Sequence, residues 1–258
     1  MWYNLDMMKI VFPEYENEVV KEGIRLAKEK LDFEAVKAVS FDDALDRLKR
    51  DEVDAMVAGI DLTTRDVILG CRDALGVKGK TFSSCFYFEK AGEIPFILAD
   101  AGVTKEADAE RLFDIVMQTY ETALKLLDEE PRIAMLSFST KGSARDASID
   151  KINEVIAKVH EMYPEVKIDG EMQLDAAVNS RVAAKKLPDS EVAGRANVLI
   201  VPDLNSGNIL YKAIEQFGGY TAAGPILQGF NKPVSDLSRG STMEDVKLVI
   251  ECMGRLLR

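Results

Sequence analysis

A segment close to the C-terminus gathers the residues best suited to chemistry. Residues 224–245 are rich in Gly, Pro and Ser, which favours a loop. Its polar and charged members include Asp236, Ser238, Arg239 and Asp245. Apolar residues then recur at helical spacing over 246–257. A polar segment that leads into a helix can bind an anion, because backbone N–H groups and the helix dipole point at the ligand.

A second junction of this kind lies at residues 59–66. It follows a predicted buried strand at 53–58 and precedes a predicted helix at 67–75. Open α/β sheets bind ligands at the carboxyl ends of their strands, so Thr63, Thr64 and Arg65 are candidates to hold a phosphate group. The alternative is that one threonine caps the helix and Arg65 is solvated, and the sequence alone favours this alternative.

Alternating strands and helices must position these residues. The N-terminal third predicts strands at 9–12, 33–39 and 53–58, with helices at 15–31 and 41–50. The remainder predicts strands at 81–88, 94–99, 132–139, 167–173 and 197–201, and helices at 105–128, 147–162, 176–186 and 209–217. This alternation is typical of parallel sheets covered by helices. No linker separates independent domains, so topology must divide the chain.

Composition limits the function further. The net charge of −11 over 258 residues argues against a nucleic-acid partner. Three widely spaced cysteines fit a reducing compartment, and we expect neither a signal peptide nor a membrane span, so the sequence predicts a cytoplasmic protein. The one histidine, His160, lies at the polar end of a predicted helix, which argues against histidine triads and histidine-rich metal sites.

Four segments together resemble the phosphate acetyltransferase and phosphate butyryltransferase family. They are Ala134–Ala144, Ile168–Ala177, Val192–Ile209 and Gly224–Gly240. The resemblance implies a reversible acyl transfer between an acyl phosphate and coenzyme A as co-substrate, with no bound cofactor and no metal in the chemistry. It also implies the isocitrate/isopropylmalate dehydrogenase-like fold, in which two α/β domains with mostly parallel sheets enclose a cleft, and a homodimer. Here the domains would be residues 1–84 plus 238–258, and residues 85–237.

The resemblance also implies roles for three residues. Asp245 matches the base that takes the proton from the coenzyme A thiol, Ser238 a serine that hydrogen-bonds the reacting sulfur or oxyanion, and Arg239 the arginine that grips the acyl phosphate. A base is needed because a thiol with a pKa of about 8.5 is mostly protonated at neutral pH. An aspartate of ordinary pKa is a weak base, so Asp245 must be perturbed or well aligned.

Structural roles for the same residues stay open. Thr242 and Asp245 have the spacing of a capping box, and an acid in the first turn of a helix favours the helix dipole. Capping and catalysis are compatible for Asp245. Arg239 could instead form an ion pair with Asp236 or Glu244.

Two departures from the family bear on activity. An arginine that the family carries after Thr63 and Thr64 falls on Leu69, and Arg65 or Arg72 would have to replace it. A helical section that carries another family arginine is missing, since only residues 40–52 join the early strands to residues 53–58. We expect an acetyltransferase acting on acetyl phosphate, phosphate and coenzyme A. The alternatives are a butyryltransferase, a weakly active or regulatory homologue that binds these ligands, and, less favoured, a dehydrogenase of the same fold.

Overall fold

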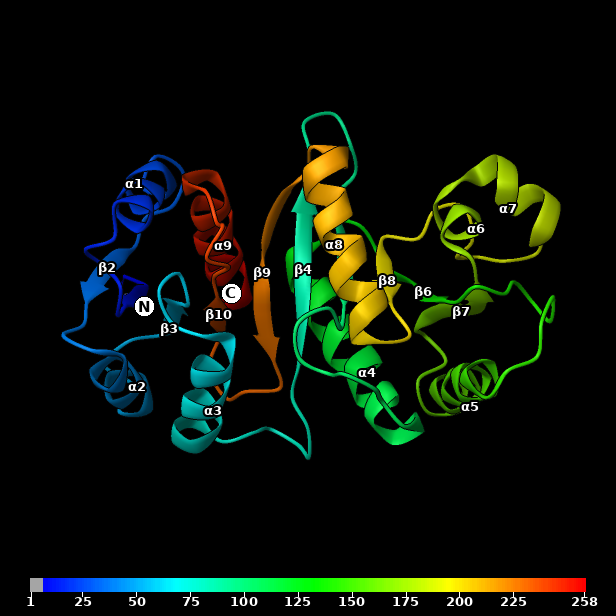
Figure 1. Cartoon of the computed structure of the whole chain (residues 1–258), viewed down its shortest axis with the longest axis horizontal. Coiled ribbons are helices and arrows are strands. Elements are labelled where there is room, and N and C mark those ends of the chain that lie inside the picture. The colour runs from blue at the N-terminus through cyan, green and yellow to red at the C-terminus, as the bar shows by residue number, and fades with distance from the viewer. Residues whose placement is uncertain (1–6) are drawn as a thin grey trace, which may run out of the picture. The chain divides into compact units, whose positions relative to one another are not determined.

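The chain divides into two units in the computed structural model, which describes residues 7–258 (Figure 1). The first unit consists of Met1–Phe82 and Thr221–Arg258, and the second of Ser83–Tyr220. The structure therefore moves the second boundary from the expected residue 237 to residue 220. The reason is that strands β9 (Thr221–Gln228) and β10 (Val234–Asp236) belong to the sheet of the first unit.

The sheet of the first unit has the strand order β2-β1-β3-β10-β9. The other three strands are β1 (Lys9–Phe12), β2 (Glu34–Lys37) and β3 (Ala55–Ala58). Neighbouring strands from β2 to β10 run parallel, and β9 is antiparallel to β10. The chain returns from the second unit to add β10 beside β3, so two segments far apart in sequence become neighbours.

Two pairs of helices cover this sheet. Helix α1 (Glu18–Ala27) packs against α9 (Met243–Leu256), and α2 (Phe41–Lys49) packs against α3 (Thr64–Leu75). Figure 1 shows the two pairs on opposite sides of the strands. The contact between α1 and α9 is close because Gly23 has no side chain, and a Cβ there would lie 2.5 Å from a methyl carbon of Val246.

The second unit has the strand order β4-β5-β8-β6-β7. Its strands are β4 (Ser83–Glu89), β5 (Phe96–Ala99), β6 (Arg132–Leu136), β7 (Lys167–Met172) and β8 (Val198–Ile200). All pairs are parallel except β4 with β5. Its helices are α4 (Ala109–Leu126), α5 (Ala147–Met162), α6 (Leu174–Val178), α7 (Ser180–Lys186) and α8 (Leu204–Gly218).

Two expectations from local composition are wrong. The segment at 224–245 is not all loop, because β10 lies between β3 and β9 and both neighbours pair with it. Tertiary pairing thus overrides the turn-forming composition. Helix α8 begins at Leu204 instead of residue 209, because the Asp203 side chain accepts a hydrogen bond of 2.8 Å from the backbone N–H of Ser206 and caps the helix.

Among residues 7–258, no helix has both the length and the apolar character needed to cross a bilayer.

Candidate functional site

The first candidate segment lies where β3 leads into α3. Thr63 is the N-cap of α3: its hydroxyl accepts the backbone N–H of Asp66 at 3.2 Å and donates to the carboxylate of Asp66 at 2.7 Å. For Thr63 the capping interpretation is therefore confirmed. Thr64 and Arg65 form the exposed first turn of α3. Arg65 forms no ion pair with any residue that the structure describes, so its charge is available to a ligand.

The second candidate segment follows β10. Ser238 and Arg239 are exposed in the turn between β10 and α9, and the Ser238 hydroxyl accepts the N–H of Gly240 at 3.3 Å. Within residues 7–258, Arg239 forms no ion pair with Asp236, Glu244 or any other acid. The guanidinium group of Arg239 is thus unused by the fold, as a ligand-binding group requires.

Asp245 caps α9, and the capping box expected from the sequence is confirmed. Its Oδ2 atom accepts the Thr242 N–H at 2.8 Å and the Thr242 hydroxyl at 2.9 Å. The Thr242 hydroxyl in turn accepts the Asp245 N–H at 3.2 Å. The cap uses only one carboxylate oxygen, and Oδ1 accepts no hydrogen bond from the described residues. Asp245 can therefore cap the helix and still accept a proton.

The sheet brings the two segments to one edge. Strands β3 and β10 are parallel neighbours with Ala58 opposite Asp236, so both chains leave the sheet at their carboxyl ends side by side. The Leu237 N–H also bonds to the Ala58 carbonyl oxygen at 2.5 Å. Loop 59–63 and segment 237–242 are thus adjacent, and the carboxyl edge is where open α/β sheets bind ligands.

Glu14 braces the first of these loops, a role that the sequence analysis missed. Its two carboxylate oxygens accept all four backbone N–H groups of residues 59–62, at 2.7, 3.3, 2.6 and 2.9 Å. Charge-assisted bonds of this kind fix a loop firmly. They also fill the N–H groups that would otherwise bind an anion, so anion binding at this junction is left to Thr64, Arg65 and the start of α3. A single acidic residue after a strand does not by itself predict that its side chain will hold a distant loop.

Asp236 is the second residue whose structural role was not evident from the sequence. It is completely buried, and neither carboxylate oxygen has a hydrogen bond of ordinary geometry to a described residue. Burial raises the pKa of Asp236 to about 6; the neighbouring Thr64 hydroxyl opposes the rise and the Glu14 carboxylate adds to it. The side chain of Asp236 faces the loop that Glu14 braces. The sequence predicts a loop at this position, so the burial of Asp236 at the end of β10 was not expected.

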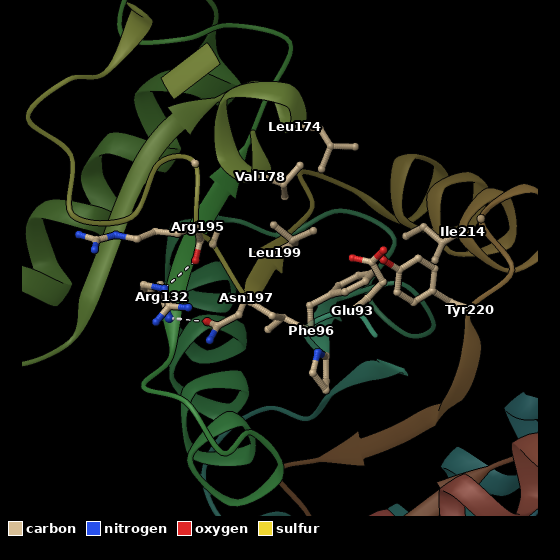
Figure 2. Close-up of a pocket in the computed structure, with 15 residues that line it drawn as sticks. Glu93, Phe96, Arg132, Leu174, Val178, Arg195, Asn197, Leu199, Ile214 and Tyr220 are labelled. Carbon is tan, nitrogen blue, oxygen red and sulfur yellow. Dashed lines mark hydrogen bonds between the residues drawn. The ribbon is translucent and has the colours of Figure 1, made fainter. Parts of the chain in front are cut away.

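An open cavity of about 510 Å³ lies in the second unit, and none of the six candidate residues lines it (Figure 2). Its floor includes the first residues of β5 and β6 and the segment that leads into β8. There the Arg132 Nε donates to the Arg195 carbonyl oxygen at 2.6 Å, and the Arg132 backbone N–H donates to the Asn197 side chain at 2.7 Å. These are the amino ends of the strands, opposite to the usual ligand edge. The mouth is apolar, with Leu174 and Val178 exposed.

Comparisons with known proteins place the chain in a family of transferases. A sequence profile of the family described as phosphate acetyl/butaryl transferase matches residues 3–252. The phosphate acetyltransferase of Clostridium acetobutylicum is 43% identical over 213 residues, which cover 79% of this chain and 63% of the relative. That of Bacillus subtilis is 42% identical over 194 residues, covering 75% and 60%. The chain thus spans less than two thirds of the length of these curated relatives.

Solved structures show the same fold. A phosphotransacetylase from Streptococcus pyogenes superimposes with a TM-score of 0.84 at 32% identity, covering 97% of this chain and 94% of that one. A 4-hydroxythreonine-4-phosphate dehydrogenase from Klebsiella pneumoniae has a TM-score of 0.60 at 10% identity, covering 98% and 100%, which is a likeness of fold alone. The expected dehydrogenase-like fold of two α/β units with mostly parallel sheets is confirmed.

Proposed function

The chain belongs to the phosphate acetyl/butaryl transferase family, and we propose that it transfers an acetyl group reversibly between acetyl phosphate and coenzyme A. The observation that carries the proposal is the pairing of β3 with β10, which sets Thr64 and Arg65 beside the segment of Ser238, Arg239 and Asp245. Relatives named phosphate acetyltransferase, 43% and 42% identical, support acetyl as the acyl group.

The proposed reaction needs one covalent exchange. The coenzyme A sulfur attacks the carbonyl carbon of acetyl phosphate, a C–S bond forms, and the bond between that carbon and the phosphate oxygen breaks. Inorganic phosphate leaves and acetyl-CoA is the product. The thiol proton passes to Asp245 and then to solvent or the leaving phosphate. Since only the thiolate is a good nucleophile, the rate depends on a base that is close and correctly oriented.

Each candidate residue has one role in this proposal. Arg239 and Arg65 hold the phosphoryl group through charge-assisted hydrogen bonds. Ser238 donates its hydroxyl hydrogen to the oxyanion that forms on the carbonyl oxygen. The free Oδ1 of Asp245 accepts the thiol proton, while Oδ2 is held by Thr242 and keeps the carboxylate in one orientation. Thr63 belongs to the cap of α3, so we give the phosphate-binding role to Thr64 alone among the threonines.

Two weaker alternatives follow from particular observations. Leu69 stands where the family carries an arginine, and only α2 lies between β2 and β3, which favours a homologue that binds the ligands but turns over slowly. A branched-chain phosphotransacylase from Enterococcus faecalis shares the fold at 21% identity, and a larger acyl group such as butyryl is the second alternative.

An assay of thioester formation tests the proposal. Purified protein is mixed with acetyl phosphate and coenzyme A, and the absorbance of the thioester is followed over time. We expect acetyl-CoA to form faster than in a protein-free mixture, and faster than butyryl-CoA from butyryl phosphate. Faster turnover of butyryl phosphate would change the acyl group. No turnover of either by folded protein, together with measurable coenzyme A binding, would favour the binding homologue.

The proposed setting is the cytoplasm, supported by coenzyme A as co-substrate and by three buried cysteines. The proposed oligomer is a homodimer. Exposed apolar side chains gather at the mouth of the cavity in the second unit, where Ile94, Leu174 and Val178 are 60%, 39% and 49% exposed (Figure 2). We assign this surface to contact with a second copy of the chain, since exposed apolar patches mark interaction sites.

A further inference from the structure

An open cavity of about 410 Å³ lies beside α7 in the second unit and shares no lining residue with the apolar cavity described above. We call it the α7 pocket. Its lining residues are Asp175 of α6 and Arg181, Val182, Lys185 and Lys186 of α7. Three of the five side chains are positive and one is negative, which leaves a net charge of +2 in a chain whose net charge is −11. A local excess of positive charge in an acidic protein attracts anions.

The fold does not use the charges of Arg181 and Lys185. Both side chains are exposed, and neither forms an ion pair or a side-chain hydrogen bond with a residue that the structure describes. Because they are four positions apart, they lie on one face of α7, where two like charges destabilise a helix. The helix dipole favours Lys185 in the last turn but disfavours Arg181 in the first. The fold therefore does not account for the position of Arg181, whereas an anionic ligand does.

Lys186 differs from these two cations because it already has partners. Its Nζ atom lies 3.4 Å from Asp175 Oδ2 and donates to Gln173 Oε1 at 2.8 Å. Gln173 is the residue after β7, and its backbone N–H bonds at 3.1 Å to the hydroxyl of Thr140, in the loop after β6. Lys186 therefore offsets the one acid of the α7 pocket. It also connects the pocket to the carboxyl ends of two parallel strands, the edge where open α/β sheets bind ligands.

We propose that the α7 pocket binds a phosphate group in its doubly charged form. Arg181 and Lys185 together match the two negative charges that a phosphate monoester carries near neutral pH. The guanidinium fork of Arg181 can bond two phosphate oxygens, and the Lys185 ammonium adds a point charge. Side chains alone hold the ligand, since the backbone N–H groups of Arg181 and Val182 are already bonded to Asn179. The inference concerns the second unit and does not depend on acyl transfer.

The phosphate group has two sources in this setting. One is inorganic phosphate or another small phosphate compound, free in solution. The other is the phosphate on the ribose of coenzyme A, the co-substrate in the proposed function. Dephospho-coenzyme A lacks only that phosphate, so a comparison of the two forms of coenzyme A separates the sources.

Calorimetric titration of inorganic phosphate at about pH 8 and low ionic strength tests the inference, because salt screens exposed charges. The pocket variant is Arg181→Gln/Lys185→Gln, and the control Lys30→Gln/Lys49→Gln removes two exposed cations outside the pocket. Both also carry Arg239→Gln, which weakens the acyl phosphate site of the proposed function. The pocket variant should bind phosphate about tenfold more weakly than the control, the worth of one hydrogen bond to a charged group. Glutamine is a good helix former, so α7 should still fold.

Equal phosphate affinity in the pocket variant and the control would overturn the inference, as would a control that binds no phosphate. If the pocket variant does not fold, Arg181→Gln and Lys185→Gln take its place singly, and each should weaken phosphate binding relative to the control. A wild type that forms no thioester would refute the proposed function and leave this test intact.

The same titration with coenzyme A and dephospho-coenzyme A identifies the source of the phosphate. If the α7 pocket holds the ribose phosphate, the control should bind coenzyme A about tenfold more tightly than dephospho-coenzyme A, and the pocket variant should bind both equally. If free phosphate is the source, each form of coenzyme A should bind the control and the pocket variant alike. Inorganic phosphate should then still bind the pocket variant more weakly than the control.

Discussion

Two aspartates nine positions apart have opposite surroundings. Asp245 is half-exposed, and one of its oxygens is held by the Thr242 N–H and hydroxyl. Asp236 is fully buried with no such partner. The same residue type is therefore an accessible helix cap at one position and a destabilising buried acid at the other. Position relative to the sheet edge makes the difference, since Asp236 ends β10 and Asp245 lies in the first turn of α9.

The buried acid makes stability depend on pH. Burial raises the pKa of Asp236 from 3.8 to about 6, so the folded state binds this proton more tightly than the unfolded state. The stabilising contribution is complete below about pH 4 and is lost as the pH rises through about 6, by up to about 3 kcal/mol. Asp236→Asn cannot ionise and should not lose it. Relative to the wild type, the variant should therefore gain up to about 3 kcal/mol of unfolding free energy between pH 4 and pH 7.5.

Urea unfolding of both proteins at the two pH values measures this difference. Asp61→Asn is a suitable control, because Asp61 is an exposed acid on the same loop. The gain should be confined to Asp236→Asn. An equal gain in the control, or none in either variant, would mean that Asp236 titrates as an ordinary surface acid.

At the scale of elements, the pairing of β3 with β10 depends on a glycine. Gly59 has a φ of 110°, and a Cβ there would lie 2.2 Å from Asp236 Oδ1 and 2.6 Å from the Leu237 nitrogen. Gly59→Ala should therefore force the two candidate segments apart and lower the unfolding free energy by roughly 3 kcal/mol. Gly79→Ala is the matched control, since a Cβ at Gly79 would have no neighbour within 4 Å. Equal stability of the two variants, measured by thermal unfolding, would contradict this account of the contact.

The elements also show how far the sequence could predict the structure. Apolar periodicity was sufficient to locate β3, α3 and α9, because each is a local pattern. The Thr242–Asp245 capping box was likewise readable from spacing. β10 was not predictable locally, because its three residues form a strand only through pairing with β3 and β9. The bracing role of Glu14 was hidden for the same reason, since its bonds reach 45 to 48 positions along the chain.

At the scale of the whole molecule, we expect a dimer in solution. Sedimentation should give a mass of about twice 28.6 kDa. Val178→Asp places a charge on the apolar mouth of the cavity and should shift the protein to the monomer, because an unpaired charge at an interface is costly. Leu124→Asp, on an apolar residue of α4 that is 55% exposed, is the control and should remain dimeric. Dissociation by Leu124→Asp alone would move the interface to α4.

The role of Asp245 as base is tested most directly by the turnover number of Asp245→Asn for acetyl-CoA formation, measured beside Asp43→Asn. Asp43 occupies the corresponding capping position of α2, where it accepts the Val39 N–H at 3.0 Å and its own N–H bonds to Ser40. Both variants should lose about 1 kcal/mol of stability at most. Only Asp245→Asn should lose activity, by at least about a hundredfold, because it alone removes the proton acceptor for the thiol. Equal turnover numbers in the two variants would make Asp245 a helix cap and nothing more.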